Sequence, residues 1–193
     1  MVDAPPSRVS EIHSSYLTVS GSAWFVHTTY IHQQARKSTS GLISEATVGF
    51  MSPDPDATVN PSYHQVCSGS TGHVKVLYVE LNKPDEDFEH FIRFFFQFHD
   101  PITKNRQGND AGTQYASVIF CEDDKQKDIA AKVISDLRGL VDDGKIKYLQ
   151  EEIHTPIIGM NPFYPADEQA YLENNPNGYR NHHYCFREWP QLI

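Results

Sequence analysis

The chain has 193 residues, of which 39% are hydrophobic, and its formal net charge is −9 at pH 7. This length can bury one sizeable core, so we expect a polar, Pro-rich arm over residues 1–14 and a single domain over residues 15–193. No apolar run approaches the roughly 18 residues that span a bilayer. The start of the chain has no apolar core of a secretory signal, so the expected location is the cytoplasm.

The charge pattern argues against nucleic acid as a partner, because Lys and Arg are scattered over an acidic chain. No membrane partner is expected either, because the chain has no apolar run long enough to span one. Cys67, Cys121 and Cys185 are odd in number and form no C-x-x-C pair, which argues against a disulfide framework or a zinc ribbon. We expect buried, reduced thiols. His182-His183 has no partner at ligand spacing, so no metal or other cofactor is predicted. The expected partner is a small-molecule substrate, and self-association is left open.

Hydrophobic periodicity predicts a strand, a turn and a helix in the first part of the domain. Alternation with β-branched residues predicts a strand over residues 16–19, which runs into a strand-to-helix turn at residues 21–24. Apolar residues then recur at helical intervals over residues 24–35. A second strand is expected over residues 42–50, and the Pro- and Asp-rich stretch at residues 51–62 is expected to be a loop.

From residue 74 onwards, the sequence predicts further strands and helices that follow one another in turn. The 86–98 stretch has a heavy aromatic face, and the 123–140 helix opens with acidic residues that suit its N-terminal dipole. The expected order is a strand at 74–81, a helix at 86–98, irregular chain at 99–114, a strand at 116–121, a helix at 123–140 and a strand at 145–154. This order predicts an α+β protein with helices against one mixed sheet.

Several gapped motifs carry a family resemblance. Residues 99–115 read H-D-P-I-T-K-N-R-Q-G-N-D-A-G-T-Q-Y, residues 60–73 read N-P-S-Y-H-Q-V-C-S-G-S-T-G-H, and residues 171–179 read Y-L-E-N-N-P-N-G-Y. Together with Phe163-Tyr164, these motifs resemble the peptide methionine sulfoxide reductase A family. The resemblance implies a ferredoxin-like two-layer α+β sandwich, with a mixed sheet, flanking helices, long irregular loops and a C-terminal tail.

The resemblance also implies a set of site residues. In the family a cysteine attacks the sulfoxide sulfur, a glutamate protonates its oxygen, two tyrosines hydrogen-bond that oxygen, and an aspartate organises the site. An aromatic pair contacts the substrate methyl group. The residues of this chain that match are Trp24, Tyr63, Asp110 and Tyr115.

Other family positions have changed. The nucleophile is replaced by Ser22, its aromatic neighbour by Ala23, and the acid by Lys75. Further replacements are Phe25 for a glycine, His27 for a glutamate and Arg180 for a recycling cysteine. Because several positions changed together, Ser22 is interpreted as natural divergence and not as an engineered change. A serine hydroxyl cannot form the sulfenic acid and disulfide of a thiol cycle, which predicts that reductase activity is improbable.

The function predicted from these residues is therefore non-reductive. We expect acid–base isomerisation or cyclisation of an oxygen-rich small molecule in specialised metabolism, such as epimerisation or the formation of a hemiacetal, ketal or spirocycle. The expected catalytic residues are Asp110, Tyr63, Tyr115 and Lys75. The expected substrate-binding residues are Ser22, Ala23, Trp24, Phe25, His27, Phe163 and Tyr164.

Two alternatives remain open. One is an inactive protein that binds methionine sulfoxide or another small polar ligand. The other is a peptide methionine sulfoxide reductase that uses another cysteine, such as Cys67. Some of the expected site residues could also have no catalytic role. Lys75 could simply be a surface residue of its strand. Asp110 and Tyr115 could serve only to hold the loop at residues 99–114.

Overall fold

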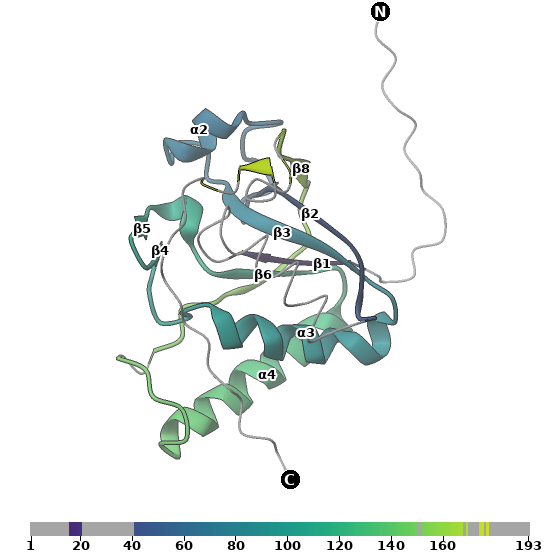
Figure 1. The fold of residues 1–193 in the computed structure, drawn as a ribbon, viewed down its shortest axis with the longest axis vertical. Helices are drawn as coiled ribbons and strands as arrows, with labels where there is room; N and C mark the ends of the chain where they lie inside the picture. The colour runs from purple at the N-terminus through teal and green to yellow at the C-terminus, as the bar shows by residue number, and fades with distance from the viewer. Residues whose placement is uncertain are drawn as a thin grey trace, which may run out of the picture.

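The computed structural model describes residues 16–20, 41–149, 152–167 and 169, together with 174, 175 and 177. Within them a six-stranded sheet has the order β7-β6-β1-β3-β2-β8 (Figure 1). Its strands are β1 (Tyr16–Ser20), β2 (Ile43–Met51), β3 (Val74–Leu81), β6 (Val118–Cys121), β7 (Ile157–Gly159) and β8 (Tyr164–Pro165). Strands β6 and β7 pair in parallel and the other neighbours are antiparallel, so the sheet is mixed.

Two helices, α3 (Pro84–Phe98) and α4 (Asp124–Asp142), lie on the same side of this sheet (Figure 1). Helix α3 buries Phe88, Phe91 and Phe95, whose spacing of three and four residues places them on one face. Pro84 opens α3 at a position where a missing N–H costs nothing. Asp123 caps α4 by accepting a hydrogen bond from the Gln126 backbone N–H at 2.7 Å. The predicted two-layer α+β fold is confirmed.

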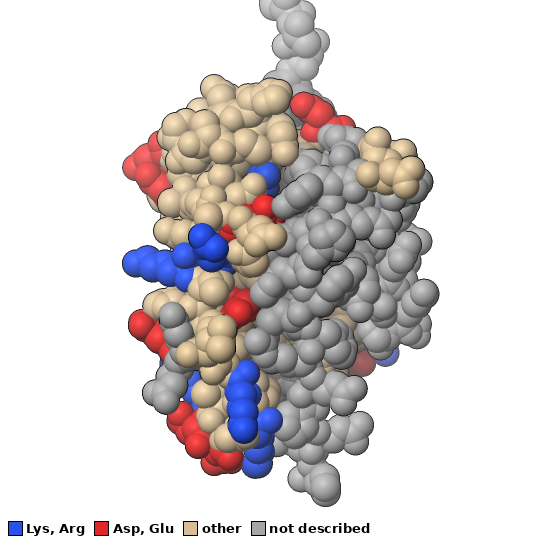
Figure 2. Space-filling model, turned by 60° about the vertical axis from the view of Figure 1, so that its left-hand side comes forward, with Lys and Arg blue, Asp and Glu red and all other residues tan. Residues whose placement is uncertain are grey.

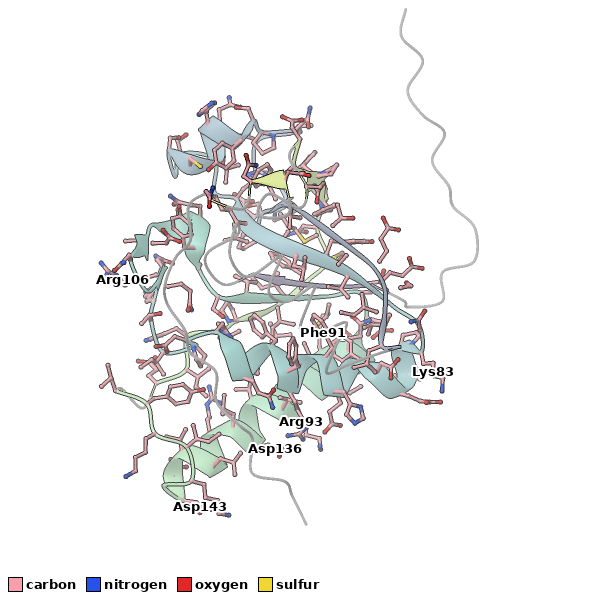
Figure 3. All side chains as sticks on the ribbon, viewed as in Figure 1. Lys83, Phe91, Arg93, Arg106, Asp136 and Asp143 are labelled. Atoms are coloured by element: carbon pink, nitrogen blue, oxygen red, sulfur yellow. The ribbon has the colours of Figure 1, made fainter. Side chains whose placement is uncertain are left out.

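The two helices are joined at their surface by an ion-pair cluster. The Arg93 guanidinium on α3 bonds Glu89 one turn earlier at 2.6 Å and Asp136 on α4 at 2.5 Å. Figure 3 labels Arg93 and Asp136 where the two helices approach each other. Lys132 adds a contact to Glu89 at 3.0 Å. Hydrogen bonds from Arg93 and Lys132 hold the pKa of the Glu89 carboxyl below its ordinary value.

The side chains of β3 alternate between two packed faces. Leu77, Val79 and Leu81 pack with the helices, whereas Val74 and Val76 join a second cluster on the opposite face. The second cluster also contains Met51, Val118 and Phe120. By the same alternation, Lys75 lies on the helix face, opposite Phe50 in the pairing register.

One predicted strand is wrong. Residues 145–154 form no strand where they are described, and the chain pairs with β6 only at β7. The reason is that the backbone N–H groups of Lys145 and Ile146 both bond the Leu140 carbonyl, which closes α4 with a turn. Those N–H groups are therefore not available to a sheet.

Several short elements lie in segments for which no helix or matching strand was predicted. They are α2 (Tyr63–Cys67), β4 (Arg106–Gln107), β5 (Asp110–Ala111) and the 3-10 turn η1 (Thr113–Tyr115). Strands β4 and β5 form a two-stranded hairpin apart from the main sheet. The expected arm at 1–14, the helix at 24–35 and the C-terminal tail after 177 lie outside the described residues.

The described surface carries both signs of charge side by side. Figure 2 shows Lys and Arg interspersed with Asp and Glu on the visible face. Among the residues described, no helix combines the length and apolar character needed to cross a membrane.

Candidate functional site

A buried cation lies between two phenol rings at the start of β3. Lys75 is only 6% exposed. Its Nζ is 4.9 Å from the centroid of the Tyr63 ring and 4.9 Å from that of the Tyr115 ring. Both distances are within the range of a cation–π attraction, which contributes about 2 kcal/mol when the cation is desolvated. We call these three residues the Lys75 site.

Tyr63 reaches this site from the first turn of α2. Ser62 caps the helix by accepting from the Gln65 backbone N–H, and the Gln65 side chain accepts from the Ser62 backbone N–H at 2.8 Å. This reciprocal capping box supports a helix of only five residues, which would be marginal alone. Val66 is fully buried and fixes the inner side of α2. The phenol of Tyr63 is therefore positioned by a short but anchored helix.

Tyr115 reaches the site from η1, and Gly112 and Gln114 hold that turn. The Gln114 side chain donates from Nε2 to the Cys67 carbonyl at 3.1 Å, which ties η1 to the end of α2. Gly112 has φ of 138°, and a β-carbon there would lie 2.3 Å from Gln114 Oε1. The backbone angle favours glycine, and a side chain there would also displace the end of the Gln114 side chain. The G-T-Q-Y sequence therefore links the two tyrosine-bearing elements.

The loop before η1 is anchored by a buried amide. Gln107 is fully buried, accepts from the Asp100 backbone N–H at 2.9 Å and donates to the Asp100 carbonyl at 2.5 Å. Its side chain thus satisfies both backbone groups of one residue, as a neighbouring strand would. Asp110 is paired with Gln107 in the β4–β5 hairpin and is half-buried. This hairpin leads directly into Tyr115.

His73 and Tyr164 adjoin the start of β3 on the side of β2 and β8. His73 is 2% exposed, its Nδ1 bonds the Thr71 carbonyl at 3.0 Å, and its ring meets the Tyr164 ring edge-on at 5.8 Å. Burial lowers the pKa of His73 from its ordinary value of 6.5. A neutral imidazole with Nδ1–H donating to Thr71 is therefore the form that the fold stabilises.

Phe163 and its sequence neighbour Tyr164 lie on opposite faces of the sheet. The Phe163 ring stacks on Tyr78 at 4.7 Å and packs with the second core cluster, on the sheet face opposite Lys75. Gly49 makes this possible, because a β-carbon there would lie 2.5 Å from the Phe163 ring. Of the predicted substrate-binding residues, Tyr164 is thus on the helix face and Phe163 is not. Ser22, Ala23, Trp24, Phe25 and His27 lie outside the described residues, beyond the end of β1 at Ser20.

The two described cysteines differ in their surroundings. Cys67 ends α2 and is half-buried, whereas Cys121 on β6 is fully buried. Burial raises the pKa of the Cys121 thiol to about 12. Cys121 is therefore an unreactive core residue, as expected, and Cys67 is the more accessible of the two. No group of three or more His, Cys, Asp or Glu among the described residues could hold a metal.

The Lys75 site brings an ammonium and two phenol groups close together, and groups of these kinds can donate hydrogen bonds to an oxygen atom. An ammonium supplies three N–H donors and each phenol supplies one O–H donor. Donors fixed in a water-poor environment stabilise negative charge that develops on oxygen. The residues that position the site, Gln107, Gly112 and Gln114, were not singled out from the sequence, although all lie in the 99–115 motif.

Comparison of this sequence with known proteins shows which family the chain belongs to. The model of the peptide methionine sulfoxide reductase family matches residues 20–189, so the chain belongs to this family. A "Probable peptide methionine sulfoxide reductase" of Schizosaccharomyces pombe is 32% identical over 166 residues, which cover 85% of this chain and 91% of that protein. A peptide methionine sulfoxide reductase of Trichodesmium erythraeum is 41% identical over 62% of this chain, and the match spans 65% of the relative's length.

Solved structures agree with this family. The reduced form of Mxr1 from Saccharomyces cerevisiae has a TM-score of 0.72 and 30% identity, covering 94% of this chain and 98% of that one. Methionine sulfoxide reductase A of Corynebacterium diphtheriae has a TM-score of 0.67 and 26% identity, covering 90% of this chain and 80% of that one. The resemblance read from the motifs is confirmed.

The relatives contradict the predicted activity. They are named as methionine sulfoxide reductases, which are redox enzymes, and not as isomerases or cyclases. The prediction of a non-redox enzyme in specialised metabolism, and of improbable reductase activity, is therefore wrong. It gave too much weight to single positions such as Ser22 and Lys75 and too little to the similarity of the whole chain.

Proposed function

We propose that the protein binds a methionine sulfoxide side chain and reduces it to methionine. The single observation that carries this proposal is the Lys75 site, in a chain whose relatives are named as reductases of this substrate. The sulfoxide oxygen would accept hydrogen bonds from Tyr63 and Tyr115. Lys75 would donate a proton to that oxygen as the sulfur–oxygen bond breaks. Asp110 would orient the loop that carries Tyr115.

The reaction needs two electrons and two protons. Two thiols supply both and become a disulfide, while the sulfoxide leaves as a sulfide and its oxygen leaves as water. Cys121 is unsuited to this role because it is buried with a pKa of about 12. Cys67 and Cys185 are the remaining thiols of the chain, and an external dithiol is the co-reactant. We place the activity in the cytoplasm, where such thiols stay reduced.

A turnover assay tests the proposal. Purified protein is incubated with dithiothreitol and an N-acetyl methionine sulfoxide amide, and methionine formation is followed by chromatography. We expect formation above the protein-free rate, reduced at least tenfold in Tyr115→Phe and unchanged in Cys121→Ala. The double variant Ser22→Cys/Lys75→Glu restores two family residues and serves as a positive control for the assay. No product from the wild type, with product from this control, would reject the proposal.

A second candidate is binding of methionine sulfoxide without turnover. Ser22 favours it, because this position holds a serine where the family motif has its cysteine nucleophile. This candidate predicts stoichiometric binding of the sulfoxide amide by calorimetry, weakened in Tyr63→Phe, with no methionine formed at any thiol concentration.

A further inference from the structure

A buried chain of side-chain hydrogen bonds begins at the end of α3. His99 follows the last residue of this helix and is fully buried, and its ring stacks on the Phe95 ring with 3.8 Å between the centroids. Its Nδ1 is 3.0 Å from the Phe95 carbonyl oxygen, one of the last four carbonyls of the helix. Because a carbonyl only accepts, Nδ1 carries a hydrogen and donates it. The stacking and this hydrogen bond together fix the orientation of the imidazole.

The other ring nitrogen continues the chain through two hydroxyl groups. His99 Nε2 is 2.8 Å from Ser117 Oγ, and Ser117 Oγ is 2.8 Å from Thr155 Oγ1. Ser117 and Thr155 are both buried. In the neutral imidazole Nε2 is an acceptor, so Ser117 donates to His99 and Thr155 donates to Ser117. The Ser117 hydroxyl is therefore held from two sides.

The far end of the chain is anchored by the backbone on both sides of Thr155. The His154 N–H donates to the Pro101 carbonyl at 2.7 Å, and the Pro156 carbonyl accepts from the Ile119 N–H at 3.0 Å. Loss of either hydroxyl would leave a buried polar neighbour with one partner fewer, which is costly. The chain thus joins the end of α3 to the segment before β7 through a single serine.

Ser117 lies in the connection between η1 and β6, two residues after Tyr115. On the other side of Tyr115, the Gln114 side chain ties η1 to the Cys67 carbonyl. The Ser117 hydroxyl is the matching tie after the tyrosine. With only one residue between them, a shift of the Ser117 backbone is passed directly to Tyr115.

We propose that His99 and Thr155 are positioning residues, which act through Ser117 on the hydroxyl of Tyr115. The proposed function supplies the role of that hydroxyl, which is to donate to the sulfoxide oxygen. The oxygen gains negative charge as the sulfur–oxygen bond breaks, so a displaced donor costs more in the transition state than in the bound substrate. The chain therefore controls the rate of the chemical step more than the affinity for substrate.

Amide hydrogen exchange of the ligand-free protein, followed by NMR, tests the positioning without a substrate. The N–H groups of Tyr115 and Ala116 are both bonded at 3.0 Å to carbonyls of the same turn, so they report on η1. Ser117→Ala should speed their exchange about tenfold, because the turn opens more often. The control is Val118→Ala, since Val118 has no polar side-chain atom and packs in the second core cluster. Equal acceleration by both changes, or none in Ser117→Ala, would overturn the proposal.

A matched pair of variants at position 155 separates positioning from stability. Thr155→Val keeps the shape of the side chain and removes the hydroxyl, whereas Thr155→Ser keeps the hydroxyl. In the sulfoxide turnover assay we expect Thr155→Val to lower kcat about tenfold with KM nearly unchanged, and Thr155→Ser to retain the wild-type kcat. Melting by circular dichroism shows that each variant is folded. A lower melting temperature in Thr155→Val with kcat unchanged would mean that the chain is only structural, and would overturn the proposal.

The two proposals can fail separately. Wild-type turnover together with unchanged exchange in Ser117→Ala rejects the positioning role and leaves the reductase proposal intact. If the wild type forms no methionine, the reductase proposal fails, and the exchange rates alone decide whether the chain holds Tyr115. Faster exchange in Ser117→Ala, with a loss of kcat in Thr155→Val that Thr155→Ser avoids, is the expected result.

Discussion

The Nζ atom of Lys75 and the ring of Tyr115 lie 4.9 Å apart, although forty residues separate them in the chain. The contact joins the start of a central strand to the last residue of η1. It depends on the Gln114–Cys67 hydrogen bond and on the Gly112 backbone, which together fold the loop back onto α2.

Gly49 should tolerate no side chain. A β-carbon there would lie 2.3 Å from the Tyr164 carbonyl oxygen and 2.5 Å from the Phe163 ring. Because one of these atoms is backbone, we expect Gly49→Ala to lower the free energy of unfolding by about 2–3 kcal/mol in urea titrations. Gly139→Ala in α4 is the matched control, since nothing lies within 4 Å of its β-carbon. It should raise stability by up to about 1 kcal/mol, and equal effects of the two changes would contradict the packing described.

Gln107 should be needed for the loop that carries Asp110 and Tyr115. Gln107→Met leaves the Asp100 backbone N–H and carbonyl without their side-chain partners in a buried place. We expect a loss of about 2–4 kcal/mol in the free energy of unfolding and weaker binding of sulfoxide. Lys104→Gln, at an exposed position of the same loop, should change stability by less than about 0.5 kcal/mol. A Gln107→Met protein as stable as this control would show that the loop has another anchor.

The cysteines should react with iodoacetamide at very different rates. At pH 8, a thiol with a pKa of about 12 is ionised to about one part in ten thousand, and Cys121 is also fully buried. Peptide mass spectrometry should therefore find Cys67 alkylated at least a hundredfold faster than Cys121. In guanidinium the two rates should converge. Rapid labelling of Cys121 in the native protein would mean that β6 opens locally.

His73 should make the protein less stable in mild acid. The pKa of His73 is lowered in the folded state by burial, so the unfolded chain binds a proton first as pH falls. Stability from this group is complete above pH 6.5 and is lost as pH falls below 6.5 towards the folded pKa. Thermal melts at pH 7.5 and 5.5 should show a decrease for the wild type and a smaller one for His73→Gln. An identical decrease in both proteins would assign the acid sensitivity to other groups.

Periodicity predicted most of the regular structure. The strand expected at residues 74–81 coincides with β3, and the helix expected at 86–98 lies within α3, because both segments bury one regular face. Helix α2 was missed because five residues carry too little periodicity, and only the Ser62–Gln65 capping box marks it. The strand predicted at residues 145–154 failed because alternation alone does not show whether a neighbouring strand exists.

The site was less accessible to sequence reasoning than the fold. Side chains of β3 alternate between the two faces of the sheet, but this pattern does not show which face packs against Tyr63 and Tyr115. The sequence alone therefore did not place Lys75 beside the two rings. Phe163 and Tyr164 are adjacent in sequence, so they were expected to act together, yet the pleat sends them to opposite faces of the sheet. The contact between Lys75 and the two rings depends on loop conformation. Only the family resemblance indicated it beforehand.

The rate of methionine formation from N-acetyl methionine sulfoxide amide, in the presence of dithiothreitol, tests the central claim most directly. The wild type is compared with the double variant Tyr63→Phe/Tyr115→Phe, which keeps both rings beside Lys75 and removes both hydroxyl groups. The account predicts measurable turnover in the wild type and a loss of at least a hundredfold in the double variant. Equal rates in the two proteins, with both folded, would contradict a role for the Lys75 site in holding the sulfoxide oxygen.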